Sequence, residues 1–260
     1  MEADLKIMSR LSPDSLFHFT SCLENLLGIL DNTFYPRYCY EEFKLMEKDQ
    51  QLFVEDAFPM VCFCDIPLSQ LMKHIEIYGK YGLGMTKEWG IRKRLNPVIY
   101  FNKNSRMANR LSVMTNSLIW DTGLIAQAFH EIMMYVKPYE GILYRGGRVT
   151  KENVRFYDEH EWRYVPDRSV MKKNEVELSI QGHIYRQPEK LADANKKLET
   201  GETSLSFNAD DVKYIIIEEE SQINEMIGEV RKIKGSRYDG DTVDRLVSRI
   251  ITVKQIENDF

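Results

Sequence analysis

The spacing of apolar residues changes near position 20, and this change constrains the fold more than any other feature of the chain. An alternating segment places Leu16, His18 and Thr20 on one face of a predicted strand and two phenylalanines on the other. Ser21 and Glu24 then have the spacing of a capping box. The apolar residues that follow recur at helical spacing, namely Leu23, Leu26, Leu27 and Leu30. The pattern predicts a strand that leads directly into a helix.

A second segment repeats this order of strand and helix. Residues 60–64 predict a short strand, and Pro67 suits an early helical position. Apolar residues then continue at helical spacing until Gly79. The glycines at 79, 82 and 84 predict a turn into a strand that another backbone or a ligand approaches closely.

The remaining elements predict an α+β fold. Strands are expected at 98–101, 161–165, 212–217 and 250–253, and helices at 112–136, broken near 121–123, and at 221–232. Residues 167–203 are polar, with one short helix, and we interpret them as an insertion or surface arm. The simplest arrangement is one domain over residues 1–260, in which helices flank a mixed sheet built from separated segments.

The composition limits the classes of function. A net charge of −5 and a pI near 5.7 argue against attraction of the whole protein to phosphate backbones, although a local basic patch remains open. The chain has no apolar run of roughly 18 residues, the length that a membrane span needs. Its start lacks the basic and apolar blocks of a signal peptide. We therefore expect a soluble protein of the cytoplasm.

The cysteines and histidines do not predict a metal site. In a reducing compartment the four cysteines are expected to be free thiols. Cys62 and Cys64 could form half of a site, but no second pair supplies the other ligands. His74 and His130 lie in helical patterns without ligand spacing.

The segment from Tyr157 to Tyr164 contains the candidate catalytic residues. If it is extended, Glu159, Glu161 and Arg163 project from one face and aromatic residues from the other. One interpretation is a catalytic pair. Glu161 would then stabilise positive charge on a ribosyl carbon while Glu159 orients or deprotonates an acceptor. The alternative is a solvated edge strand whose charged side chains pair weakly at the surface.

Candidate cofactor-binding residues lie in the first strand and at the glycine turn. His18 and Thr20 share a face and could contact a ribose or the amide of nicotinamide. Tyr78 or Tyr81 could stack on a nicotinamide ring. For His18 the alternative is a structural histidine, and for the tyrosines it is core packing.

These motifs together resemble the AbiGi family of abortive phage resistance proteins. The resemblance covers roughly residues 15–260, and its most specific part is Asp-Ile-Pro-Leu-Ser followed by Tyr-Gly. The motifs that carry it are Leu16–Thr20, Pro59–Ser69, His74, Tyr78–Gly82 and Glu161–Arg163. The family implies one component of a two-gene abortive infection system, in the role of antitoxin, with a partner protein encoded in the same operon.

A more remote resemblance is to ADP-ribosyltransferases of the His-Tyr-Glu type, including DarT-like toxins. It implies an ADP-ribosyltransferase-like fold with NAD as substrate, in which His18 holds a ribose, Tyr78 or Tyr81 packs on nicotinamide, and Glu161 is catalytic. The sequence departs from the pattern in having two candidate tyrosines. The Ser-Thr-Ser segment of the other transferase branch is also missing.

Two functions of different classes follow from these resemblances. One is an NAD-consuming defence enzyme that hydrolyses NAD or transfers ADP-ribose to a protein or nucleic-acid acceptor. The other is a non-enzymatic antitoxin that binds a toxin encoded beside it, with residues 167–203 as the expected interface.

Overall fold

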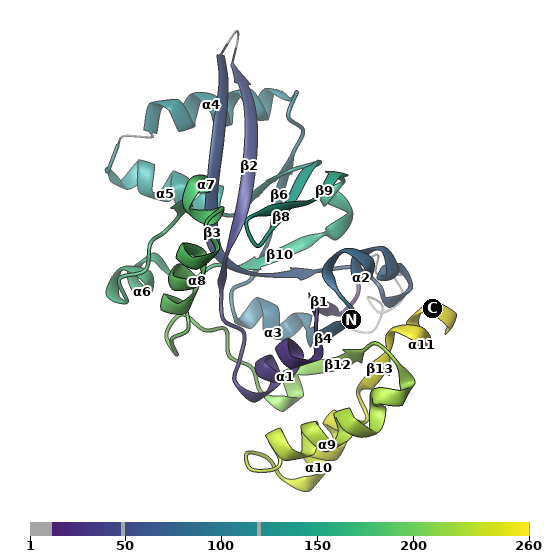
Figure 1. The fold of residues 1–260 in the computed structure, drawn as a ribbon. Coiled ribbons are helices and arrows are strands. Elements are labelled where there is room, and N and C mark those ends of the chain that lie inside the picture. Colours follow the sequence, from purple (N-terminus) through teal and green to yellow (C-terminus); the bar gives the residue numbers. More distant parts are fainter. Residues whose placement is uncertain (1–11, 48–49, 119–120, 260) are drawn as a thin grey trace, which may run out of the picture. The chain divides into compact units, whose positions relative to one another are not determined.

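The computed structural model describes residues 12–47, 50–118 and 121–259, and these residues form two compact units (Figure 1). The first unit combines residues up to 32 with 63–92 and 207 onward, and the second combines 33–62 with 93–206. Each unit contains both helices and strands. The predicted α+β class is confirmed, whereas the assignment of residues 1–260 to one domain stays a prediction.

The sheet of the first unit is mixed, as predicted. Strand β1 (Ser15–Thr20) pairs antiparallel with β4 (Tyr81–Thr86) and, through Phe17, with Cys64 at the end of β3. On its other side β4 pairs antiparallel with β12 (Val212–Ile217). Parallel pairing of β12 with β13 (Ile250–Thr252) completes the order. Segments far apart in the sequence therefore lie side by side in one sheet.

Helices cover this sheet, and their apolar residues form its core. They are α1 (Leu23–Asp31), α2 (Met72–Tyr78), α3 (Lys87–Arg92), α9 (Ile223–Lys234), α10 (Gly240–Val247) and α11 (Val253–Asp259), with single turns at Leu68–Gln70, Ala209–Asp211 and Glu220–Gln222. Leu26 and Leu30 of α1 are fully buried, as the helical spacing predicts. The predicted capping box is wrong, because Cys22 is the N-cap residue and no side chain caps the helix.

Glycine is required at three positions around β4, because atoms of β1 lie too close to the backbone there to leave room for a Cβ. Gly79 ends α2 with a φ of 119°, and a Cβ there would lie 2.2 Å from the carbonyl oxygen of Thr20. At Gly82 and Gly84 a Cβ would lie 2.8 Å from the rings of Phe19 and Phe17, respectively. The prediction that another backbone approaches this turn closely is therefore confirmed.

The second unit is built on a long antiparallel ribbon. Strands β2 (Arg37–Glu47) and β3 (Gln50–Cys64) pair continuously from Arg37 opposite Met60 to Glu47 opposite Gln50. The strand predicted at 60–64 is only the end of β3. The shorter strands are β5 (Asn96–Pro97), β6 (Ile99–Phe101), β7 (Val136–Pro138), β8 (Gly141–Arg145), β9 (Arg148–Val154), β10 (Glu161–Tyr164) and β11 (Ile180–Gln181).

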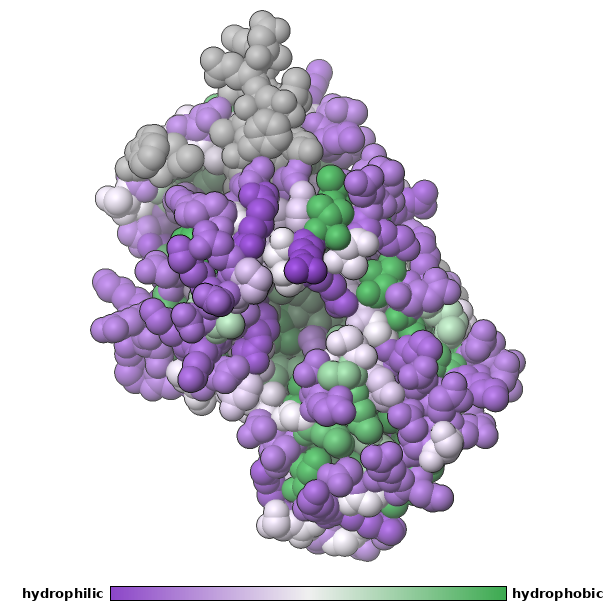
Figure 2. Space-filling model, viewed as in Figure 1, coloured by the Kyte–Doolittle hydropathy of each residue, from purple (hydrophilic) through white to green (hydrophobic). Residues whose placement is uncertain are grey.

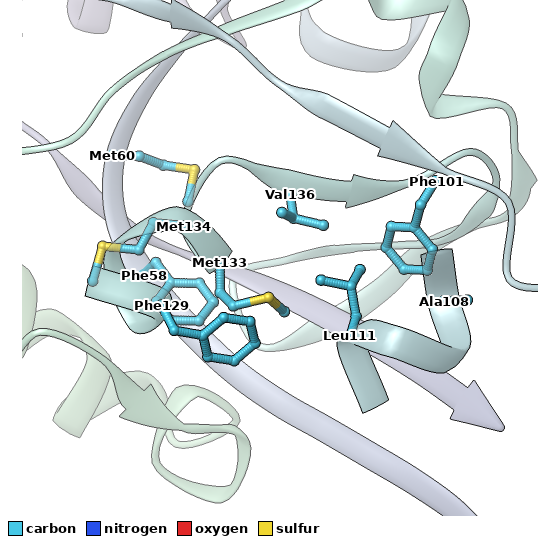
Figure 3. Packing of buried hydrophobic residues seen from close by; sticks show 9 residues of the cluster. All are labelled: Phe58, Met60, Phe101, Ala108, Leu111, Phe129, Met133, Met134 and Val136. Atoms are coloured by element: carbon cyan, nitrogen blue, oxygen red, sulfur yellow. The ribbon is translucent and has the colours of Figure 1, made fainter. Parts of the chain in front are cut away.

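Helices α4 (Arg106–Leu118) and α5 (Leu124–Met133) correspond to the helical region predicted at 112–136, and they are separated where the sequence predicts a break. Helix α4 begins earlier than predicted. Both helices contribute to one apolar cluster with the end of β3, as Figure 3 shows. Its members are Phe58, Met60, Phe101, Ala108, Leu111, Phe129, Met133, Met134 and Val136.

Residues 167–203 contain α6 (Arg168–Lys173), β11, α7 (Gly182–Tyr185) and α8 (Pro188–Lys197). Their apolar side chains are buried against Tyr38 and Tyr40 of β2. The buried members from this segment are Met171, Val176, Ile180, Tyr185, Leu191 and Leu198. Although residues 167–203 are polar in composition, their apolar side chains form one buried side of the segment. Whether the segment is an insertion stays a prediction.

The face shown in Figure 2 is mainly hydrophilic, with hydrophobic residues in small areas between the polar ones. Among the described helices, none is both long enough and apolar enough to cross a membrane.

Candidate functional site

Strand β10 places its charged residues in the interior. Glu161 is 4% exposed and Arg163 is fully buried, whereas Trp162 and Tyr164 are only half-buried. The interpretation of this segment as a solvated edge strand is therefore wrong. Burial of charged groups is tolerated only when each has a partner, so their contacts decide what this site is.

Both carboxylate oxygens of Glu161 accept hydrogen bonds from cations. Arg163 Nε donates to Oε1 at 2.6 Å, and Lys137 Nζ donates to Oε2 at 2.6 Å. Lys137 also donates to Glu159 Oε2 at 3.0 Å. One ammonium group thus lies between the two carboxylates that the sequence singles out.

Glu159 approaches Lys137 from a helical turn and not from an extended strand. It ends a single helical turn, Phe156–Glu159, and His160 then adopts the left-handed conformation with a φ of 44°. Glu159 is therefore not on an extended strand with Glu161. The turn nevertheless brings its carboxylate to the same ammonium group.

Arg163 has two further partners in the second unit. Its Nη1 donates to the carbonyl of Met134 at 2.7 Å, and its Nη2 donates to the carboxylate of Glu41. We call Glu41, Lys137, Glu159, Glu161 and Arg163 the charge cluster. Three carboxylates face two cations in it, and each of the five residues is less than a tenth exposed.

Sequence reasoning missed Glu41, Lys137 and Tyr100, whose hydroxyl accepts from the backbone N–H of Glu161 at 2.8 Å. Glu41 follows an alternation, Tyr38 and Tyr40 against Cys39 and Glu41, that could have predicted strand β2. Lys137 carries no such signal, because a lone lysine between apolar residues does not show that its ammonium group is buried.

The electrostatics of the cluster favour a charged Glu161. Burial alone would raise the pKa of Glu161, but the nearby Arg163 and Lys137 outweigh it and hold that pKa well below its usual range. Burial also dominates at Glu41 and raises its pKa despite Arg163. Chemically the cluster is a satisfied ion network, in which Glu161 has no carboxylate oxygen without a donor.

The candidate cofactor residues lie in the first unit, and three of them share one face. Thr20 pairs directly with Tyr81 across β1 and β4, and His18 pairs with Leu83. Residues opposite one another in an antiparallel pair project to the same side, as do alternate residues of a strand. Among the described residues, Thr20 Oγ1 is a buried hydroxyl without a hydrogen-bond partner.

The structure distinguishes the two candidate tyrosines. Tyr81 lies with His18 and Thr20, and its hydroxyl accepts from Gln222 Nε2 at 3.0 Å. Tyr78 ends α2 and packs in the cluster of Phe17 and Phe19, on the opposite face of the sheet. Its ring also stacks on His74, with centroids 4.3 Å apart.

The four cysteines are free thiols in this structure. Within the part of the chain that the structure describes, no group of three or more His, Cys, Asp or Glu residues is arranged to hold a metal ion.

Comparison with known proteins places the chain in a family. Residues 32–218 match the family model described as "Putative abortive phage resistance protein AbiGi, antitoxin". A curated relative, "Abortive phage resistance protein AbiGi" of Lactococcus lactis subsp. cremoris, is 32% identical over 254 residues, covering 87% of this chain and 99% of the relative. The chain belongs to the AbiGi family. No solved structure matches this AbiGi protein significantly.

The match to the AbiGi family confirms the resemblance inferred from the motifs. The family model spans the whole second unit, including every residue of the charge cluster. It does not extend to His18 or Thr20 of β1.

Proposed function

We propose that this AbiGi protein acts in phage defence as an antitoxin, by binding a toxin protein encoded beside it. The family model and the curated relative both carry the name of abortive phage resistance. The description of the model also includes the word antitoxin. An antitoxin needs a surface for its partner, and helix α5 offers one.

The apolar residues of α5 occupy two sides of the helix. One side is buried in the core through Ala126, Phe129 and Met133. The other side exposes Leu124, Ile125, Ala128 and Ile132, which we call the apolar stripe. Leu124 is 82% exposed, Ile125 73% and Ile132 51%. A contiguous apolar surface on a helix that already covers a core is typical of a protein-binding site, and this observation carries the proposal.

Co-purification tests the stripe. A tagged chain carrying Ile125→Glu is expected to lose the product of the neighbouring gene, because a charged group is inserted into an apolar interface. Ile91→Glu is the matched control, since Ile91 is also an exposed isoleucine, 63% exposed, on helix α3 of the first unit. Equal retention of the partner by both variants, or loss with Ile91→Glu alone, would contradict this site.

NAD-dependent ADP-ribosyl transfer, or NAD hydrolysis, is the second candidate. What favours it is the shared face of His18, Thr20 and Tyr81, because a buried hydroxyl without a partner is suited to a ribose or amide group. This candidate includes an ADP-ribosyltransferase-like fold, with Glu161 as the catalytic carboxylate and Glu159 assisting. Against it stands the pairing of Glu161 with two cations.

Calorimetric titration with NAD and mass spectrometry of released nicotinamide separate the two candidates. An enzyme would release nicotinamide, and Glu161→Gln would abolish the release while Tyr78→Phe leaves it intact. An antitoxin would release none, and the folded Glu161→Gln variant would still retain its partner.

A further inference from the structure

The second unit exposes a basic hairpin next to a pair of exposed tyrosines. Strands β8 and β9 pair antiparallel around the turn at Gly146 and Gly147, both of which have positive φ. Residues 141–155 contain four cations and one acid, Glu152, so their formal charge is +3 in a chain of net charge −5. The cations are Arg145, Arg148, Lys151 and Arg155, and all four are exposed.

Tyr139 and Tyr157 lie at the base of this hairpin, just before β8 and just after β9. Their rings stack with centroids 5.4 Å apart and planes 28° apart, and the backbone N–H of Tyr157 donates to the carbonyl of Tyr139. Tyr139 is 37% exposed and Tyr157 46%. We call this pair the tyrosine platform.

Two contacts with β6 residues fix the position of the tyrosine platform. Tyr100 contacts Tyr157 edge-on at 5.3 Å, and the N–H of Tyr139 donates to the carbonyl of Phe101. Fixed aromatic rings lose little conformational entropy when a ligand stacks on them. Among the nearby cations, Arg155 lies 3.7 Å from Asp158 and Lys103 lies 4.0 Å from Glu140, and both cations remain more than half exposed.

We propose that the tyrosine platform and the β8–β9 hairpin bind single-stranded nucleic acid, with a base stacked on the platform and the phosphates along the hairpin cations. Single-strand-binding proteins combine these two features, a stacking surface for bases and a line of cations for the backbone. An acidic polypeptide would also be attracted to the cations but would make no use of exposed, stacked rings. The surface is distinct from the apolar stripe of α5, so the proposal does not depend on the proposed function.

Fluorescence anisotropy with labelled oligo-dT and oligo-rU of about twelve nucleotides tests the proposal. Tyr157→Leu is expected to weaken binding roughly tenfold, whereas Tyr157→Phe keeps the ring and is expected to bind as the wild type does. Lys151→Glu is expected to weaken binding and to reduce the dependence of log K on log salt by about 0.7. Lys254→Glu, at an exposed lysine of α11 in the first unit, is the matched control.

Three results would overturn the proposal. One is the absence of binding to either oligonucleotide at low salt. Another is equal weakening by Lys254→Glu and Lys151→Glu in variants whose thermal unfolding is unchanged. The third is binding of polyglutamate that competes with the oligonucleotides and is indifferent to Tyr157→Leu, which would assign the surface to an acidic protein.

Discussion

Lys137 is the residue on which the charge cluster depends, because its ammonium group contacts both Glu159 and Glu161. A buried ion pair contributes little net stability compared with apolar residues, but removal of one partner leaves the other charge uncompensated. Lys137 also lies over the ring of Phe156 at 4.4 Å, which adds a cation–π contact. Removal of any one charged group from the cluster is therefore expected to destabilise the protein.

We predict that Lys137→Met lowers the free energy of unfolding by about 3–5 kcal/mol, because two buried carboxylates lose their shared cation. Lys103→Met is the control. Its ammonium group lies 4.0 Å from Glu140 with both side chains 56% exposed, and exposed pairs contribute about 0–1 kcal/mol. Urea unfolding measures the free energy of unfolding of both variants. An equal decrease in the two would show that the charge cluster is solvated.

The pH dependence of stability is predicted to come partly from Glu161. Arg163 and Lys137 hold the folded-state pKa of Glu161 below its ordinary value of 4.5. The stability that Glu161 contributes is therefore present above pH 4.5 and is lost as the pH falls toward the folded-state pKa. Glu41 has a raised pKa and acts in the opposite sense, since its contribution is lost as the pH rises. Urea unfolding between pH 7 and pH 3 should show that the destabilisation by Glu161→Gln shrinks on acidification. A constant difference would contradict the prediction.

At the scale of elements, the sequence predicts best where periodicity and packing agree. The strands predicted at 16–20, 212–217 and 250–253 are confirmed, because each has a strong apolar signal, although Val253 already begins α11. Strands β1 and β12 lie inside the sheet, whereas β13 is at its edge. The long ribbon of β2 and β3 was not predicted in full, since it contains charged residues and its pairing depends on partners in the fold. The same limit applies to the site. Alternation predicts that Glu161 and Arg163 share a face, but nothing local predicts that this face is buried.

Two glycine substitutions at the element scale are expected to have opposite signs. Gly28→Ala in α1 adds a methyl group that meets no atom within 4 Å, so it should stabilise the protein by about 0.5–1 kcal/mol. Gly79→Ala should destabilise it by more than about 2 kcal/mol, because it combines positive φ with a clash against Thr20. Thermal unfolding measures both variants. An unchanged unfolding temperature in Gly79→Ala would contradict the close approach of Thr20 in β1 to this turn.

At the scale of the whole molecule, the two units are interleaved along the chain. Residues 63–92 of the first unit are inserted between the two segments of the second, so neither unit is a continuous piece of sequence. Each unit has its own buried apolar cluster. Periodicity cannot predict this arrangement, because it reports local structure and not which distant segments share a core.

The boundaries of the family model provide a test of this organisation. A fragment of residues 32–218 keeps every segment of the second unit but lacks β1, α1 and the helices after β12. Strand β4 then loses its partner β1, and the cluster of Phe17 and Phe19 loses Val253 and Ile256 as well. We predict that the second unit folds in this fragment and that the remaining segments of the first do not. Hydrogen exchange should then show protected amides in β2 and β3 and rapid exchange in β4 and β12. Protection of β4 equal to that in the full chain would mean that its stability does not depend on β1, and loss of protection in both units would mean that the second unit cannot fold without the first.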